Sequence, residues 1–143
     1  MTAGLSGFLL VRAGDRRVGL DLSQVIEVTQ LGPVHPVPAV EPALRGVVAV
    51  HGRMVPVVHL GSLLAGVGYP AETGGVAVLV KLDGGRVCFE VDEAEILMRE
   101  PALPVPPGEA LPWAVGVARH PEGLVPLLDL PALSSRLMEA AAQ

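Results

Sequence analysis

Two β-branched runs that meet at a glycine turn form a stretch that occurs twice, and this repetition limits what the chain can fold into. The first occurrence, residues 46–60, reads GVVAVHGRMVPVVHL. Such runs, here joined at His51-Gly52-Arg53, predict two short strands paired as a hairpin. Because Pro56 has no N–H to donate to a neighbour, its strand is expected to be an edge strand or to carry a bulge there.

The second occurrence keeps the register of the first. A likeness upstream, between residues 17–22 and 86–91, runs at an offset of 69. Three positions recur at an offset of 70: Gly46 as Gly116, Pro56 as Pro126 and Leu60 as Leu130. We therefore predict two copies of one β unit rather than a coincidence between valine-rich stretches. The copies are placed at about residues 7–63 and 77–133, within a single domain of residues 1–143.

Composition narrows the class of protein. A length of 143 residues suits one domain with a real core. Because 50% of the residues are hydrophobic and only 3% are aromatic, that core must be built from Val, Leu, Ile and Ala. The net charge of −5 comes without a basic stripe, so nucleic acid is not expected as a partner.

No export or membrane signal is visible. The N-terminus lacks a basic region followed by an apolar core. The longest uncharged run, Met54–Tyr69, contains Pro56 and is shorter than the ~20 residues of a spanning helix. The single cysteine, Cys88, cannot form an internal disulfide and is expected to be a small buried hydrophobe. We expect a cytoplasmic protein with no direct membrane insertion.

Short strands separated by frequent turns run along the whole chain. Proline-rich loops are expected at residues 32–42 and 101–112, a helical turn at 62–65, and a C-terminal helix at 133–142. Strands are expected at residues 7–13, 16–22, 25–29, 76–82, 86–92, 95–99, 113–119 and 123–130, and in both arms of the 46–60 hairpin.

The pattern predicts an all-β fold of small antiparallel barrels. Each copy supplies about five strands, and a five-stranded unit alone has little core. The two units must therefore share apolar surface, either side by side or with exchanged strands.

Several motifs follow one another in a characteristic order over about residues 7–135. They are Val25-Ile26-Glu27-Val28, Val37-Pro38, Gly46-Val47 with Gly52, Val55 to Leu60, Val91-Asp92, and Gly116-Val117 with Leu127 to Leu130. In this order and spacing they resemble the CheW-like family of chemotaxis adaptor domains. The resemblance implies two intertwined five-stranded barrels of SH3-like shape, to which the residues add the short C-terminal helix.

The resemblance also implies a function. Members of the family are non-enzymatic scaffolds without a cofactor. They couple the regulatory domain of a CheA-type histidine kinase to the cytoplasmic tips of methyl-accepting chemoreceptors, and other CheW-like domains are further partners. The kinase contact uses apolar surface at a barrel end, and the receptor helical hairpin lies in a groove between the barrels.

This chain departs from the family at the first hairpin. The turn there usually reads Asn-Leu-Arg-Gly, whereas here Ala49, Val50 and His51 precede Gly52. His59 also stands where the family usually has Asp before the final leucine of the hairpin. The altered turn favours a specialised or accessory adaptor.

By the resemblance, partner-contact positions fall on the third strand and on the first hairpin. They are Val25, Glu27, Val28, Arg45, Gly46, His51, Gly52, Arg53 and Met54. The plainer interpretation of the third strand is a barrel strand with Val25 or Val28 facing in and Glu27 solvated. Both interpretations stay open at this point.

Neither catalysis nor metal binding is expected. His51 and His59 alone would make a poor zinc site. Asp92 and Asp129 lack a nucleophile or an oxyanion donor nearby in the sequence, so they more plausibly accept backbone N–H groups at strand ends. Trp113 is assigned to core packing.

Two other function classes compete with the adaptor. A small-ligand-binding β-barrel module would need a concave cavity with convergent polar groups. An enzyme fragment would need clustered titratable residues with shifted pKa values. An adaptor predicts flat apolar patches instead.

Overall fold

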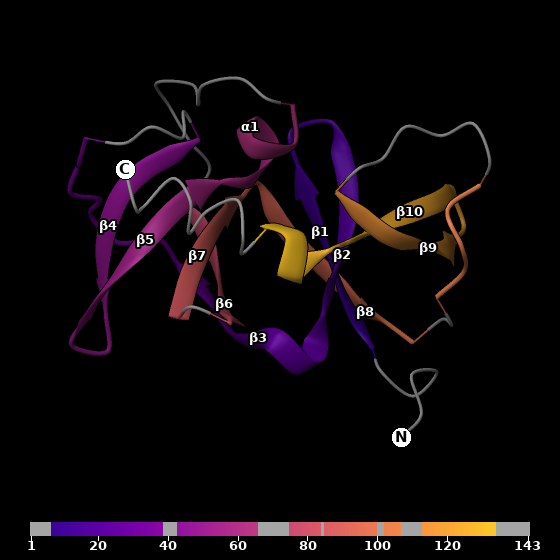
Figure 1. Ribbon diagram of the computed structural model, residues 1–143, viewed down its shortest axis with the longest axis horizontal. Coiled ribbons are helices and arrows are strands. Elements are labelled where there is room, and N and C mark those ends of the chain that lie inside the picture. Colours follow the sequence, from indigo (N-terminus) through magenta and orange to yellow (C-terminus); the bar gives the residue numbers. More distant parts are fainter. Residues whose placement is uncertain are drawn as a thin grey trace.

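The computed structural model contains two five-stranded sheets that lie side by side (Figure 1). It describes residues 7–38, 43–65, 75–83, 85–99, 102–106 and 113–133. The strands are β1 Phe8–Ala13, β2 Arg16–Asp21, β3 Val25–Gln30, β4 Leu44–Val50, β5 Arg53–His59, β6 Val76–Leu82, β7 Gly85–Val91, β8 Glu93–Met98, β9 Ala114–His120 and β10 Gly123–Leu128. Short helices are η2 Leu22–Gln24 and α1 Leu60–Ala65.

Strands are exchanged between the two halves of the chain. Barrel A has the order β8-β1-β2-β10-β9, and barrel B has the order β3-β6-β7-β5-β4. Replacing each strand of barrel B by the strand five places away in sequence reproduces the order of barrel A. The all-β, intertwined fold is therefore confirmed, with exchanged strands rather than units side by side. The topology supports the two-repeat hypothesis, whose boundaries stay a prediction.

The exchange is made through one parallel pairing in each barrel. β10 runs parallel to β2, and β5 runs parallel to β7, while the other pairings are antiparallel. β1–β2 and β6–β7 are hairpins that each half lends to the barrel completed by the other half. Neither half of the chain thus contains all the strands of a barrel.

A core shared by both barrels holds them together. On β7, Val87, Phe89 and Val91 face this shared core, while Cys88 faces the interior of barrel B. Full burial of a side chain such as Phe89 contributes roughly 1.5–3 kcal/mol relative to exposure. Trp113 packs against the shared core, as expected, and Arg16 stacks over its ring at 5.5 Å from the centroid.

Two glycines let the proline-rich segments cross closely over the sheets. His35 pairs with Val47 of β4, and Leu103 pairs with Val117 of β9. A Cβ on Gly46, whose φ is 149°, would overlap the carbonyl of His35. A Cβ on Gly116 would lie 2.7 Å from the carbonyl oxygen of Leu103. The repeated glycine is therefore a requirement of close backbone approach.

The expectation for Pro56 was wrong. β5 lies between β4 and β7, and no bulge occurs at Pro56. Val47, which faces Pro56, uses its backbone N–H and C=O to bond His35 on the opposite side. The Val47–Pro56 pair therefore exchanges no hydrogen bonds, and the ladder to β7 begins only at Val57. No strand hydrogen bond at this position therefore requires the N–H that Pro56 lacks.

His59 takes the place of an aspartate cap. Asp129 accepts the N–H of Ala132 at 3.1 Å through its carboxylate, as expected of a residue at a strand end. His59, seventy residues earlier, accepts the N–H of Ser62 at 3.2 Å through Nδ1 and so caps the start of α1. An accepting Nδ1 requires the proton to be on Nε2, so this cap uses the neutral ring.

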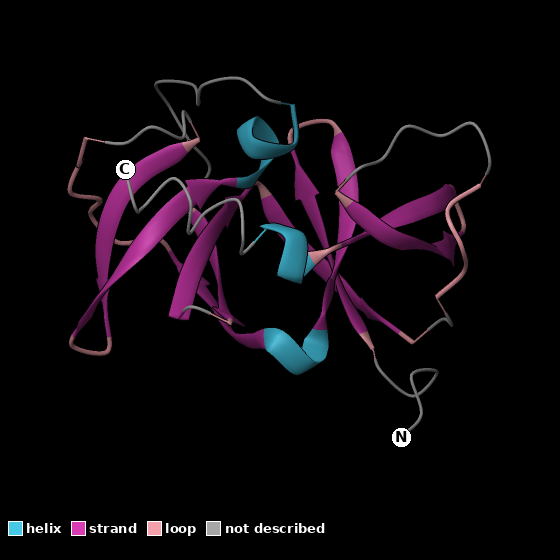
Figure 2. Cartoon of the chain, in the orientation of Figure 1, coloured by secondary structure: helices cyan, strands magenta, loops and turns pink. Residues whose placement is uncertain are grey.

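Most expected elements are confirmed within a residue or two. β8 begins two residues earlier than expected, and η2 forms the turn expected at Ser23-Gln24. At the C-terminus a helical turn occupies residues 130–133, and the rest of the expected helix, like Gly84 of the β6–β7 turn, lies outside the described residues. Helices are short throughout the described part of the chain (Figure 2), and none is long and apolar enough to cross a membrane.

Gly46→Ala should destabilise the fold severely, by about 3 kcal/mol or more, because the new Cβ must displace the backbone at His35. Gly52→Ala is the matched control, since Gly52 also has a positive φ, 78°, but nothing lies within 4 Å of its Cβ position. It should cost only about 1 kcal/mol. Urea unfolding measures both, and equal losses would contradict the packing role of Gly46.

Candidate protein-interaction surfaces

The edge strand β3 exposes apolar side chains. Ile26 and Val28 are 41% and 44% exposed, while Val25 is half-buried and packs against the shared core. Val25 therefore fits the barrel-strand interpretation, and Val28 fits a contact position. Ile26 was not singled out from the sequence, because only the register of β3 against β6 shows which side chains face outward.

Two of the predicted contact residues meet across barrel B. His51 and Gly52 form a two-residue turn, and both have positive φ values, 50° and 78°. Nε2 of His51 bonds the carboxylate of Glu27 on β3, 24 residues away. The tip of the β4–β5 hairpin is thereby joined to the opposite edge strand of the barrel, and Glu27 is not simply solvated.

Arg45 and Gly46 lie inside the structure. Nη1 of Arg45 bonds the fully buried carboxylate of Glu90 on β7 at 3.0 Å, and the Arg45 side chain is 19% exposed. Gly46 is buried beneath His35. Removing one partner of such an ion pair leaves a buried charge uncompensated. We therefore assign this pair to holding the fold together rather than to contact with a partner protein.

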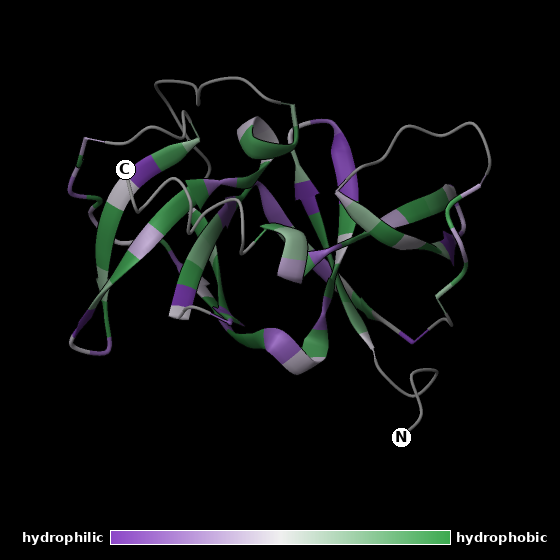
Figure 3. Ribbon diagram, in the orientation of Figure 1, coloured by the Kyte–Doolittle hydropathy of each residue, from purple (hydrophilic) through white to green (hydrophobic). Residues whose placement is uncertain are grey.

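The outer face of the β4–β5 hairpin is apolar. Ala49 and Met54 are cross-strand partners, and both are exposed, with Met54 at 56%. Pro56 is exposed on the same face. We call Ala49, Met54 and Pro56 the apolar surface of barrel B; Figure 3 shows hydrophobic residues along β4 and β5. Val28 does not belong to it, because Val28 pairs with Val78 of the shared core and so lies on the face of β3 turned toward barrel A.

Barrel A also exposes large apolar side chains. They are Leu97 of β8 at 55%, Val115 of β9 at 66% and Leu124 of β10 at 52%. Leu124 occupies the position equivalent to Met54. None of the three was predicted; the repeat offset from Met54 to Leu124 was the one signal available. Leu97 pairs with Leu9, which belongs to the shared core, so Leu97 lies on the face of β8 that is turned toward barrel B.

Nothing in the described residues favours catalysis or a bound metal. No group of three or more His, Cys, Asp or Glu side chains among them could hold a metal ion. A hollow of about 220 Å³ opens between β3 and β4, and Glu27 and His51, which already bond each other, lie at it. This volume is below the roughly 300–1,000 Å³ of typical ligand sites.

Burial sets the pKa and the reactivity of the single cysteine. Cys88 is buried in barrel B, and desolvation, followed by the nearby charge of Glu27, raises the pKa of its thiol from 9.0 to about 11. The thiol is therefore protonated and unreactive near neutral pH. The expectation of a small buried hydrophobe is confirmed.

Charged side chains of barrel A pair with one another. Arg17 bonds Glu95 at 2.9 Å and lies 3.5 Å from Glu122, and these contacts, the hydrogen bond to Glu95 first, raise the pKa of Arg17. Arg12 lies 3.6 Å from Asp92 and 3.5 Å from Glu93. Asp92 also accepts the N–H of Gly14 at 2.7 Å, as expected of a carboxylate at a strand end.

Comparisons with known proteins agree with this fold. A family model for the CheW-like domain matches residues 7–138. Among solved structures, the chain is similar to the scaffolding protein TtCheW from Thermoanaerobacter tengcongensis, with a TM-score of 0.77 and 19% identity over 90% of this chain and 91% of that one. At this identity the likeness shows the fold. No curated protein matches the chain.

The raised pKa of Cys88 predicts a loss of stability in alkali. Between about pH 9 and pH 11 the unfolded thiol releases its proton while the folded thiol keeps it, so stability falls as pH rises. The stability advantage of wild type over Cys88→Ala should shrink by up to about 2–3 kcal/mol across this window in urea unfolding. An advantage that stays constant to pH 11 would contradict the burial of the thiol.

Proposed function

Since the chain belongs to the CheW-like domain family, we propose that it is a non-enzymatic cytoplasmic adaptor that couples a CheA-type histidine kinase to chemoreceptors in a bacterial signalling array. The family is one of scaffolds, and the fold matches that of a scaffolding protein.

The observation that carries the proposal is exposed apolar surface on both barrels. Met54 and Leu124 are each more than half exposed at equivalent positions of the two barrels. Large apolar side chains left exposed on a small protein favour sites that bind other proteins. An adaptor needs at least two such surfaces, because it must hold two partners at once.

We assign the kinase to the apolar surface of barrel B. Met54 is 56% exposed on this surface, and the contact between His51 and Glu27 holds the hairpin tip against β3. A rigid apolar surface loses little conformational entropy when a partner binds. The regulatory domain of the kinase, which is itself CheW-like, would offer a surface of the same kind.

We assign the receptor to the groove between the barrels. Leu97 is exposed on the face of β8 that is turned toward barrel B. An apolar side chain at such a rim suits the apolar stripe of an amphipathic helix. The receptor tip is a helical hairpin, so it would present such a stripe.

His51 gives the adaptor its specialised character. The family arginine at this turn offers a planar guanidinium with five N–H donors, whereas a histidine offers an imidazole ring with two nitrogens. His51 bonds Glu27, so the contact between hairpin tip and β3 is kept by a side chain of different chemistry. We propose an accessory or specialised adaptor on this basis.

Ala49→Glu should reduce the amount of kinase retained by the immobilised chain about tenfold or more, because it puts a charge into an apolar contact. Gln30→Glu is the control: it adds the same charge at an exposed position of β3, outside this surface, and should retain the kinase. Circular dichroism checks that both variants fold. Full retention by Ala49→Glu would remove the barrel B surface from the kinase contact.

Leu97→Glu should separate the two partners. It should lower co-sedimentation with receptor-containing membranes and leave kinase retention unchanged, because it alters the groove alone. Loss of kinase retention with receptor binding intact would reverse the assignment of the two surfaces.

A further inference from the structure

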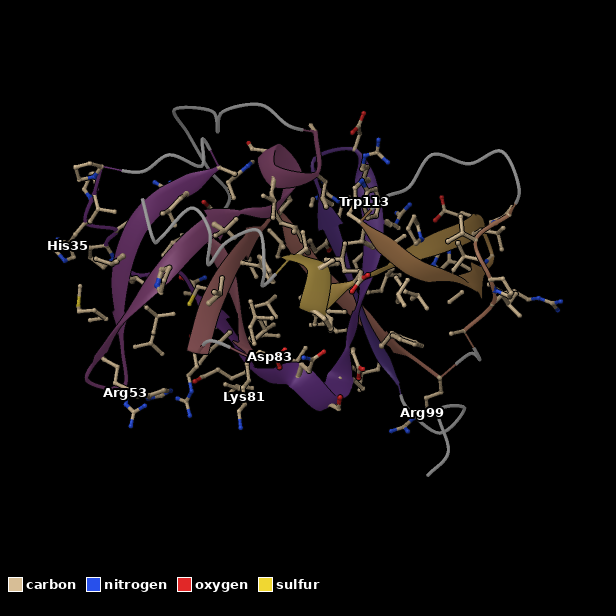
Figure 4. The ribbon with its side chains drawn as sticks, viewed as in Figure 1. His35, Arg53, Lys81, Asp83, Arg99 and Trp113 are labelled. Atoms are coloured by element: carbon tan, nitrogen blue, oxygen red, sulfur yellow. The ribbon has the colours of Figure 1, made fainter. Side chains whose placement is uncertain are left out.

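Three cationic side chains lie at one mouth of barrel B. Arg53 begins β5, Lys81 lies near the end of β6 and Arg86 lies near the start of β7. Each continues a row of side chains that face the barrel interior, such as Val55 on β5, Leu79 on β6 and Cys88 on β7. Figure 4 shows Arg53 and Lys81 extending from the same edge of barrel B.

This cluster has no partner within the described part of the chain. Lys81 and Arg86 are directly opposite each other in the β6–β7 hairpin, and like charges so placed are destabilising. None of the ion pairs between described residues involves Arg53, Lys81 or Arg86. Asp83, in the adjoining turn, is exposed and makes no ion pair with them. A chain with a net charge of −5 thus leaves three cations together.

Barrel A shows which groups satisfy such a pair. Its equivalent residues, Arg12 and Arg17, are also direct cross-strand partners. There the two arginines contact four carboxylates of the same chain: Asp92, Glu93, Glu95 and Glu122. At the positions of barrel B equivalent to Glu95 and Glu122, the chain has Ile26 and Gly52, which carry no charge. The anionic partners present in barrel A are therefore missing in barrel B.

The three cations also surround a hollow. It has a volume of about 360 Å³ and is lined by Arg53, Met54, Val55, Lys81, Gly85 and Arg86. Its volume falls within the roughly 300–1,000 Å³ of binding sites. Met54 belongs both to this hollow and to the apolar surface of barrel B, so the two are continuous.

We infer that Arg53, Lys81 and Arg86 bind the carboxylates of an acidic segment on a partner protein, which supplies in trans what Glu95 and Glu122 supply within barrel A. The inference rests on the proposed adaptor function in that the acidic segment belongs to a docked protein. The apolar surface gives contact area, and the cation cluster fixes orientation and speeds encounter.

The test is an NMR titration of the isotope-labelled full chain with an eight-residue polyglutamate peptide at low salt. Amide shifts are expected around residues 53, 81 and 86, and they should weaken when salt is raised. Lys81→Glu/Arg86→Glu should bind the peptide at least about tenfold more weakly. Arg99→Glu/Arg119→Glu changes the net charge equally at exposed positions outside the hollow and should bind as wild type does.

Three results of the peptide titration would overturn the inference. They are the absence of shifts at these amides with millimolar peptide, equal binding by wild type and Lys81→Glu/Arg86→Glu, and equal losses in the two double variants. Inorganic phosphate is titrated in parallel. If it shifts the same amides at lower concentration than the peptide does, the site binds phosphate rather than carboxylates, and the inference fails.

Thermal unfolding and kinase pull-downs separate the effects of these variants on folding from their effects on partner binding. Lys81→Glu alone places opposite charges across the β6–β7 hairpin, so it should raise the melting temperature by roughly 1–3 °C while it weakens peptide binding. A lower melting temperature would contradict the repulsion between Lys81 and Arg86. In kinase pull-downs, Lys81→Glu/Arg86→Glu should retain less kinase than Arg99→Glu/Arg119→Glu. Failure of wild type to retain kinase would refute the adaptor function but leave the peptide titration decisive for the site.

Discussion

The exchange of strands between the two halves of the chain is the constraint on which the rest of the structure depends. Each half lends a hairpin to the barrel that the other half completes, and the parallel pairings β2–β10 and β5–β7 fasten it there. Because Phe89 and Leu20 enter one shared core, the barrels cannot be separated without opening that core. The interlocking sets the distance and the angle between the two outer surfaces, which is what a scaffold must control.

Charge breaks the symmetry that the repeat would otherwise impose. Barrel A neutralises its cross-strand arginine pair with carboxylates from β8 and the β9–β10 turn. In barrel B the carboxylate of Glu27 is bonded to His51 instead. The caps differ as well, with His59 in one half and Asp129 in the other. Two similar barrels therefore present different chemistry at equivalent positions.

The repeat and the resemblance together predicted the strands, the barrels and their intertwining, since apolar alternation and turn residues are local signals. Pro56 was misjudged because its tolerance depends on His35, a residue distant in sequence that takes the hydrogen bonds of Val47. Leu97 and Val115 were missed because exposure depends on which face a strand turns outward after the exchange. The contact of Glu27 with His51 and that of Arg45 with Glu90 join separate strands, so no local pattern could have paired them.

The interlocked barrels should unfold as one unit, and the chain carries one tryptophan and one cysteine that can report on it. Trp113, just before β9 of barrel A, packs against the shared core, and Cys88 lies inside barrel B. Tryptophan fluorescence and thiol accessibility should be followed together through a urea titration. Strand exchange predicts a single transition with coincident midpoints for the two probes. Separate midpoints would mean that the barrels unfold independently and would contradict the account.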